Sequence, residues 1–122
     1  MICAGIDAGS RAIKAVLIDA ETLEIQARGI TGQGVKQDAL ARQLFNSLLI
    51  ECGLSHDDVK RTVATGYGRN IVSIADTTVT EITCHAVGVH QVVPDAMTVV
   101  DIGDRTASWF GSTKQATFAI ST

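Results

Sequence analysis

Two segments far apart in the chain share one pattern, an apolar run that ends in Asp-x-Gly. They are Gly5-Ile6-Asp7-Ala8-Gly9-Ser10 and Val99-Val100-Asp101-Ile102-Gly103-Asp104. Short apolar runs bounded by turn residues are typical of strands. A carboxylate at the end of a buried strand needs a metal ion, a cation or backbone N–H donors, because burying it unpaired is costly. The pattern therefore predicts two strand-ending turns that each present a carboxylate to such a partner.

The beginning of the chain predicts an antiparallel meander of three strands. Apolar runs cover Ile2 to Asp7 and Ile13 to Asp19, with Gly9-Ser10 between them, and a weaker run covers Leu23 to Ile30. Each run is bounded by residues that favour turns.

An amphipathic helix should follow this meander. Apolar residues recur there at spacings of three and four, and the helix has a C-terminal glycine in Gly53. These apolar residues, which we assign to the core, are Leu40, Leu44, Phe45, Leu48 and Leu49. Ser55 and Asp58 are spaced to cap a short turn, and Thr62 to Thr65 is a candidate fourth strand that runs into Gly66.

The rest of the chain is less regular. The pattern from Ile71 to Val93 is mixed and mostly helical, interrupted at Thr77-Thr78 and closed by Pro94, and Met97 to Ile102 predicts a buried strand. We place a first lobe at residues 1–96 and the start of a second at 97–122.

Composition excludes several classes of protein. The 122 residues are 46% hydrophobic and 19% charged, which is globular rather than disordered. A net charge of −3 and the lack of a basic run disfavour nucleic acid as a partner. We see no apolar run of the roughly 18 residues that a bilayer requires. Three scattered cysteines argue against a disulfide framework, which favours a reducing compartment. Together with the short apolar runs, this leads us to expect a cytoplasmic protein without a membrane partner.

The first Asp-x-Gly turn has the residues of a phosphate-binding hairpin. Asp7 could hold hydrated Mg²⁺, Gly9 and Ser10 could donate to phosphate oxygens, and Lys14 would add positive charge. An ordinary β-hairpin is the alternative. The second turn, at Asp101 and Gly103, favours the functional interpretation, since nucleotide clamps close two such hairpins around the phosphates.

Four motifs, in order and spacing, carry a resemblance to one family. The sequence resembles the N-terminal part of the BadF/BadG/BcrA/BcrD-type ATPases, close to the activators of 2-hydroxyacyl-CoA dehydratases, over residues 1 to about 103. The motifs are Gly5-Ile6-Asp7-Ala8-Gly9-Ser10 with Lys14, Ala64-Thr65-Gly66-Tyr67-Gly68-Arg69-Asn70, Glu81-Ile82-Thr83-Cys84-His85-Ala86 and Val100-Asp101-Ile102-Gly103.

The resemblance implies an α/β fold. It would be the ribonuclease-H-like N-terminal lobe of actin, sugar-kinase and Hsp70-type ATPases, a mixed sheet with a three-strand antiparallel start and flanking helices. It also implies ATP or ADP and Mg²⁺ as cofactors. Complete relatives are homodimers that share a 4Fe-4S cluster and couple ATP hydrolysis to electron transfer into a dehydratase or benzoyl-CoA reductase component.

Site residues carry over by position. Asp7 and Asp101 would be catalytic, with Asp7 holding Mg²⁺ through water, and the cofactor-binding residues would be Gly9, Ser10, Lys14 and Gly103. The motifs at Thr65 to Asn70 and at Glu81 to Ala86 receive no role. Tyr67 and Arg69 could contact a ligand or form a structural turn. None of the three cysteines stands at a cluster-ligand position.

The sequence departs from the family after Gly103. The family continues the second hairpin as Gly-Gly-Gln-Asp-Ser-Lys, whereas this chain continues as Asp104-Arg105-Thr106-Ala107-Ser108. Read one base out of step, codons for Gly103 to Ser108 permit Gly-Gln-Asp-Ser-Lys, and those for Trp109-Phe110 permit the aliphatic pair that should follow. Our hypothesis is that a base was lost near Gly103, which makes residues 104–122 an out-of-frame tail.

The sequence therefore predicts the N-terminal part of an ATP-dependent activator, with little or no activity alone and a tail prone to aggregation or strand swapping. The alternative is a non-catalytic docking domain derived from the same family. A ribonuclease-H-like nuclease is disfavoured, because two metal ions need more converging acidic residues than Asp7 and Asp101.

Overall fold

The computed structural model describes residues 1–92, 98–102, 107–112 and 117–121. It divides into two compact units, Met1–Val79 and Thr80–Thr122, which are described separately. The division into lobes at 96/97 stays a prediction.

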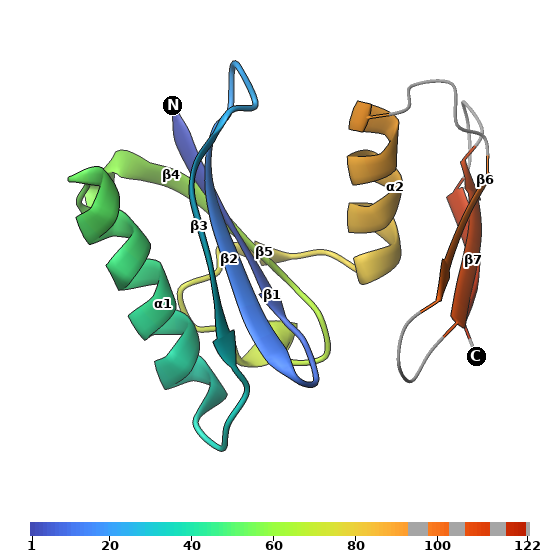
Figure 1. Ribbon diagram of the computed structural model, residues 1–122, viewed down its shortest axis with the longest axis horizontal. Helices are drawn as coiled ribbons and strands as arrows, with labels where there is room; N and C mark the ends of the chain where they lie inside the picture. Colours follow the sequence, from blue (N-terminus) through green and yellow to red (C-terminus); the bar gives the residue numbers. More distant parts are fainter. Residues whose placement is uncertain (93–97, 103–106, 113–116, 122) are drawn as a thin grey trace. The chain divides into compact units, whose positions relative to one another are not determined.

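The first unit is built on a mixed five-stranded sheet in the order β3-β2-β1-β4-β5 (Figure 1). The first three strands pair antiparallel, whereas β4 pairs parallel with β1 and β5 parallel with β4. The predicted antiparallel start is confirmed. The strands are β1 (Ile2–Ala8), β2 (Ala12–Asp19), β3 (Ile25–Gly32), β4 (Val59–Thr65) and β5 (Thr77–Thr78).

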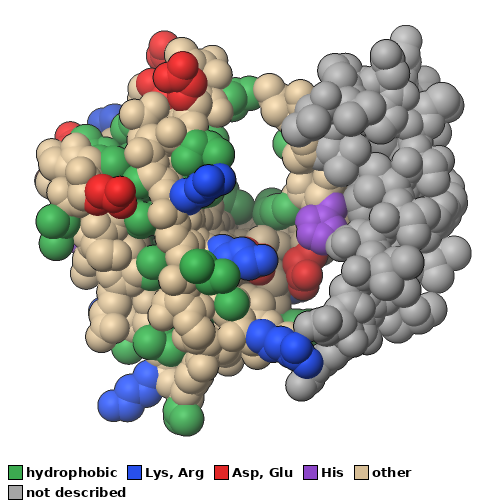
Figure 2. Space-filling view, viewed as in Figure 1, with side chains coloured by type: hydrophobic (Ala, Val, Ile, Leu, Met, Phe, Trp, Pro, Cys, Tyr) green, Lys and Arg blue, Asp and Glu red, His purple; other side chains and the backbone are tan. Residues whose placement is uncertain are grey.

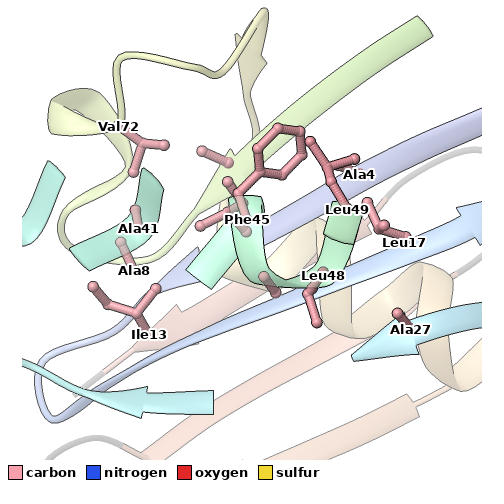
Figure 3. Packing of buried hydrophobic residues seen from close by; sticks show 13 residues of the cluster. Ala4, Ala8, Ile13, Leu17, Ala27, Ala41, Phe45, Leu48, Leu49 and Val72 are labelled. Carbon is pink, nitrogen blue, oxygen red and sulfur yellow. The ribbon is translucent and has the colours of Figure 1, made fainter. Parts of the chain in front are cut away.

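Helix α1 (Gln37–Cys52) covers one face of this sheet and buries the core against it (Figure 3). The helix lies close to β3 because Gly29 has no side chain, and a Cβ there would lie 2.9 Å from Leu44 Cδ1. The predicted helix is confirmed, as is its C-terminal glycine, since Gly53 adopts a left-handed conformation with φ 67°. The core comprises Ala4, Ile6, Ala8, Ile13, Ala15, Leu17, Ala27, Ala41, Phe45, Leu48, Leu49, Ala64 and Val72.

Short elements connect the end of α1 to β5. Ser55 and Asp58 form the predicted capping box of the 3₁₀ turn η1 (His56–Asp58), and a second 3₁₀ turn, η2 (Arg69–Ile71), follows β4. The mostly helical pattern predicted from Ile71 to Val93 is borne out by α2 (Glu81–Val92), and the predicted interruption at Thr77-Thr78 is β5, but residues 72–76 form turns and bends rather than helix. Asp76 explains this difference, because its backbone N–H donates to the Thr62 carbonyl at 2.8 Å and its carboxylate accepts the Thr62 N–H at 2.7 Å. These bonds hold Asp76 against β4, and the two residues that follow it pair with β4 as β5.

The second unit contains α2 (Glu81–Val92) and an antiparallel sheet in the order β6-β7-β8. The strands are β6 (Thr98–Ile102), β7 (Ala107–Ser112) and β8 (Thr117–Ser121). The predicted strand at Met97 to Ile102 is confirmed as β6, although Met97 itself lies outside the described residues. In the part of the chain that the structure describes, neither α-helix has the length and apolar character needed to cross a bilayer.

Replacing Ile13 with valine should destabilise the first unit. Ile13 is 0% exposed, so Ile13→Val leaves a gap in the core and should lower the free energy of unfolding by about 1 kcal/mol. Urea denaturation followed by circular dichroism measures this. Ile50→Val is the matched control, because Ile50 is 80% exposed on α1 and should change the stability little. Equal losses in both variants would contradict the assigned core.

Candidate functional site

A row of polar side chains crosses three strands where β1 and β4 end. Asp7 pairs in register with Lys14 on β2 and with Thr65 on β4. Their chain neighbours Ala8, Ile13 and Ala64 belong to the core packed against α1. Because successive residues of a strand point to opposite faces, the three polar residues share the face away from α1. The carboxyl ends of parallel strands are where open α/β sheets bind their ligands.

The turn between β1 and β2 is stabilised by a hydrogen bond within the turn and by hydrogen bonds from Gln33. The Gly9 N–H donates to the Ala12 carbonyl at 3.0 Å and closes the turn. Gln33 holds the outside, because its Nε2 donates to the Gly9 carbonyl at 2.6 Å and its backbone N–H to the Arg11 carbonyl at 2.9 Å. With the Gly9 amide engaged, Ser10 is exposed in this turn and can offer donors outward.

The loop after β4 lies directly against the end of β1. Gly66 has φ 92°, and a Cβ built on it would lie 2.5 Å from the Ala8 carbonyl oxygen and 2.6 Å from Asp7 Oδ1. The Gly68 N–H donates to the same Ala8 carbonyl at 2.9 Å. The Thr65 to Asn70 motif, which received no role from the sequence, thus includes a structural turn that packs on the predicted phosphate hairpin.

The two side chains of this loop that the sequence singles out behave differently. Arg69 folds back, since its Nη1 donates to the Gly66 carbonyl at 3.1 Å. Tyr67 is 69% exposed. This contact of Arg69 supports a role in forming the turn rather than in contacting a ligand.

Among the residues that the structure describes, three buried oxygen atoms around this end of the sheet have no hydrogen-bond partner. They are Asp7 Oδ1, Thr65 Oγ1 and Gln37 Oε1. Leaving a buried polar atom unpaired costs about 1–3 kcal/mol, so such atoms need an explanation. Two of the three belong to the polar row. A carboxylate and a hydroxyl beside glycines that leave no room for a Cβ form a donor set that suits a hydrated Mg²⁺ ion and a phosphate.

The carboxylate of Asp38 fixes the first turn of α1. Asp38 accepts hydrogen bonds from the Ser73 backbone N–H and hydroxyl, both at 2.9 Å, and from Arg42 at 3.1 Å. The Ser73 backbone bond is the main cause that lowers the pKa of Asp38 below its usual value. Ser73 follows η2, and Asp38 lies in the first turn of α1, just after the loop that carries Gln33. The hydrogen bonds between Ser73 and Asp38 therefore fix the segment after η2 to the same end of α1 that follows this loop.

The predicted site residues fall into two groups. Asp7, Gly9, Ser10 and Lys14 lie together at the tip of the β1–β2 hairpin. Asp101 lies on β6 of the other unit, and Gly103 lies outside the described residues. The closing of two hairpins around one nucleotide therefore stays a prediction.

The cysteines do not form a cluster site in the part of the chain that the structure describes. Cys3 lies on β1, Cys52 at the end of α1 and Cys84 on α2, and all three are free thiols. Among the described residues, no three His, Cys, Asp or Glu side chains gather as metal ligands would. These residues do not fit an iron–sulfur cluster.

Comparison with known proteins gives a consistent result. The model of the BadF/BadG/BcrA/BcrD ATPase family matches residues 4–109. The chain is 39% identical over 107 residues to the activator of lactoyl-CoA dehydratase from Anaerotignum propionicum, which covers 88% of this chain and 40% of that protein. It is 33% identical over 105 residues to a component of benzoyl-CoA reductase from Thauera aromatica, covering 84% and 37% of the two chains.

A solved structure supports the same relationship. The activator of 2-hydroxyisocaproyl-CoA dehydratase from Clostridium difficile, determined with bound ADPNP, superposes with a TM-score of 0.81 at 30% identity, over 98% of this chain and 46% of that one. The predicted α/β fold of actin-like ATPases is confirmed. The chain spans about 40% of the length of the curated relatives it matches.

Placing a side chain on Gly66 should disrupt this end of the sheet. In Gly66→Ala, the new Cβ would clash with the Ala8 carbonyl at a φ that L-residues rarely adopt, so we expect a loss of about 2 kcal/mol in unfolding free energy. Thermal and urea denaturation measure it. Gly32→Ala is the control, because nothing lies within 4 Å of a Cβ there. A Gly66→Ala variant as stable as the wild type would show that the loop does not pack on β1 as described.

Proposed function

The chain belongs to the BadF/BadG/BcrA/BcrD ATPase family, and we propose that it is the N-terminal part of an ATP-dependent activator of a 2-hydroxyacyl-CoA dehydratase or related reductase. Within that protein it would bind the phosphates of ATP or ADP together with Mg²⁺. The polar row at the ends of β1 and β4 carries this proposal. It brings together the carboxylate of Asp7, the amine of Lys14 and the hydroxyl of Thr65, beside a loop in which Gly66 has no room for a side chain.

Each residue of the hairpin has a definite task in this proposal. Ser10 donates hydrogen bonds to phosphate oxygens from the exposed tip of the turn. Lys14, opposite Asp7 in the β1–β2 register, contributes positive charge to the phosphates. Asp7 accepts hydrogen bonds from water bound to Mg²⁺, which keeps several of its waters in such sites. Gly9 closes the turn, and a Cβ there would crowd the Ala12 carbonyl oxygen at 3.0 Å.

The bound Mg²⁺ would neutralise charge that develops on the phosphates during hydrolysis. The chain's own contribution is to hold those phosphates and the hydrated ion in a fixed place, which accounts for most of the catalysis of phosphoryl transfer. The hairpin can do this because Gln33 and Gly66 restrain it from two sides.

Catalysis needs the second hairpin as well. We assign Asp101 and Gly103 to it by their family positions, so both stay proposals. In the whole activator, a second copy of the chain, the shared 4Fe-4S cluster and the dehydratase or reductase component belong to this proposal, together with a cytoplasmic location. Figure 2 shows both acidic and basic side chains on this face of the first unit, and the net charge of −3 does not favour nucleic acid as a partner.

The departure of residues 104–108 from the family pattern favours a second candidate, a lobe that docks to an intact relative without catalysis. The polar Gln-Asp pair that the family carries after its second glycine is replaced here by Asp104-Arg105-Thr106. Capture of a full-length family member, in the absence of nucleotide binding by this chain, distinguishes docking from the leading proposal.

Nucleotide binding is the direct test of the leading proposal. The 122-residue chain should bind ADP weakly in the presence of Mg²⁺, and Asp7→Asn should weaken that binding at least about tenfold, which corresponds to about 1.4 kcal/mol. Isothermal titration calorimetry measures both. Asp57→Asn, an exposed position on η1, should bind like the wild type. ATP turnover should stay near background, and undiminished ADP binding by Asp7→Asn would refute the assigned site.

The reading-frame hypothesis has a separate test. We propose that residues 104–122 are translated out of frame after the loss of one base near the Gly103 codon. Resequencing the gene should reveal that base, or find Gly-Gln-Asp-Ser-Lys encoded in the next frame. An unbroken frame with no such continuation in the neighbouring one would end the hypothesis, whatever the outcome for nucleotide binding.

A further inference from the structure

Two of the unpartnered oxygen atoms at the site belong to residues that are paired across the sheet. Asp7 Oδ1 and Thr65 Oγ1 are both buried without a hydrogen-bond partner among the described residues, and Asp7 and Thr65 are register partners on the parallel strands β1 and β4. Side chains at paired positions of adjacent strands share one face and lie within a few ångströms. The third such atom, Gln37 Oε1, lies instead against Gly68, because a Cβ built on Gly68 would be 2.6 Å from it.

Bulk solvent does not reach either atom of this pair. Both are buried, and Gly66 closes over the carboxylate so tightly that a Cβ on it would lie 2.6 Å from Asp7 Oδ1. The partner of each must therefore come from the protein, from an enclosed water or from a bound ligand. Asp7 as a whole is only half-buried, and its second oxygen, Oδ2, is not among the buried unpartnered atoms.

The chemistry of the two groups is complementary. An ionised carboxylate only accepts hydrogen bonds, whereas a threonine hydroxyl carries one proton that rotates toward the best acceptor. Hydrogen bonds to charged acceptors are the stronger ones, and they fix the orientation of the carboxylate. Groups that orient a metal-binding carboxylate in this way typically change metal affinity by about 10–100-fold when they are removed.

We propose that Thr65 is a positioning residue for Asp7. When the hydrated metal ion is bound, the Thr65 hydroxyl donates to Asp7 Oδ1 and holds Oδ2 toward a metal-bound water. This rests on the proposed function, since the metal ion is the one that accompanies the nucleotide. It gives the threonine of the Thr65 to Asn70 motif a task beyond the turn made by its glycines.

The test compares nucleotide affinity with and without Mg²⁺ in the 122-residue chain. Calorimetry measures the affinity for ADP with Mg²⁺ and the affinity for ADP in EDTA. The ratio of the two is the factor by which Mg²⁺ strengthens nucleotide binding. Thr65→Val keeps the shape but removes the hydroxyl, and it should reduce that factor roughly tenfold while binding of ADP in EDTA stays unchanged. Thr65→Ser keeps the hydroxyl and should restore the factor. Thr62→Val is the matched control, because Thr62 is buried on the same strand but not at the polar row.

The outcomes separate this inference from the proposed function. Equal Mg²⁺ dependence in Thr65→Val and wild type overturns the role of Thr65 while nucleotide binding stands. Wild-type chain that binds no ADP with Mg²⁺ overturns both. A purely structural Thr65 would lower the melting temperature of Thr65→Val without changing its Mg²⁺ factor. If Thr65→Val does not fold, nuclear magnetic resonance of the wild type decides: the Thr65 signals should shift when Mg²⁺ is added to the ADP complex, and unchanged signals overturn the inference.

Discussion

The close approach between Gly66 and the end of β1 is the constraint on which the rest of the site depends. No Cβ fits between this residue and the Ala8 carbonyl, and Gly68 donates to that same oxygen. This contact can form because β4 pairs parallel with β1. Since β3 runs in the same direction as β1, the chain needs a crossover between β3 and β4, and α1 lies in that crossover. The fold thus places a strand end from the middle of the chain beside the opening turn.

The opening turn is also supported by residues that make no contact with a ligand in our proposal. Gln33 holds two of its carbonyl groups, and Asp38 ties the first turn of α1 to Ser73. Both supports come from the short stretch between β3 and the first turn of α1. A phosphate-binding turn benefits from such restraint, because preorganised donors need no rearrangement when the ligand arrives.

The sequence predicts the parts of this structure that follow from local pattern. Alternating or continuous apolar runs indicate the three opening strands, and the spacing of Leu40 to Leu49 indicates α1. The position of β4 beside β1 is not predicted, because parallel pairing joins residues distant in the sequence. For the same reason the local pattern marks Thr65 only as a strand end, and Gln33 only as part of a glycine loop. The pattern does not predict the turns at residues 72–76, because the conformation there depends on the contact of Asp76 with Thr62 on another strand.

The central claim is that the turn at Asp7 and Gly9 binds nucleotide phosphates, with the loop after β4 as its second wall. Backbone amide shifts of the 122-residue chain, followed by nuclear magnetic resonance during titration with ADP and Mg²⁺, test it most directly. Our account predicts that the changes in the first unit concentrate at residues 7–14 and 65–68, with little change at the C-terminal end of α1. Shifts that centre on α1 or β3, or no shifts at saturating nucleotide, would contradict it.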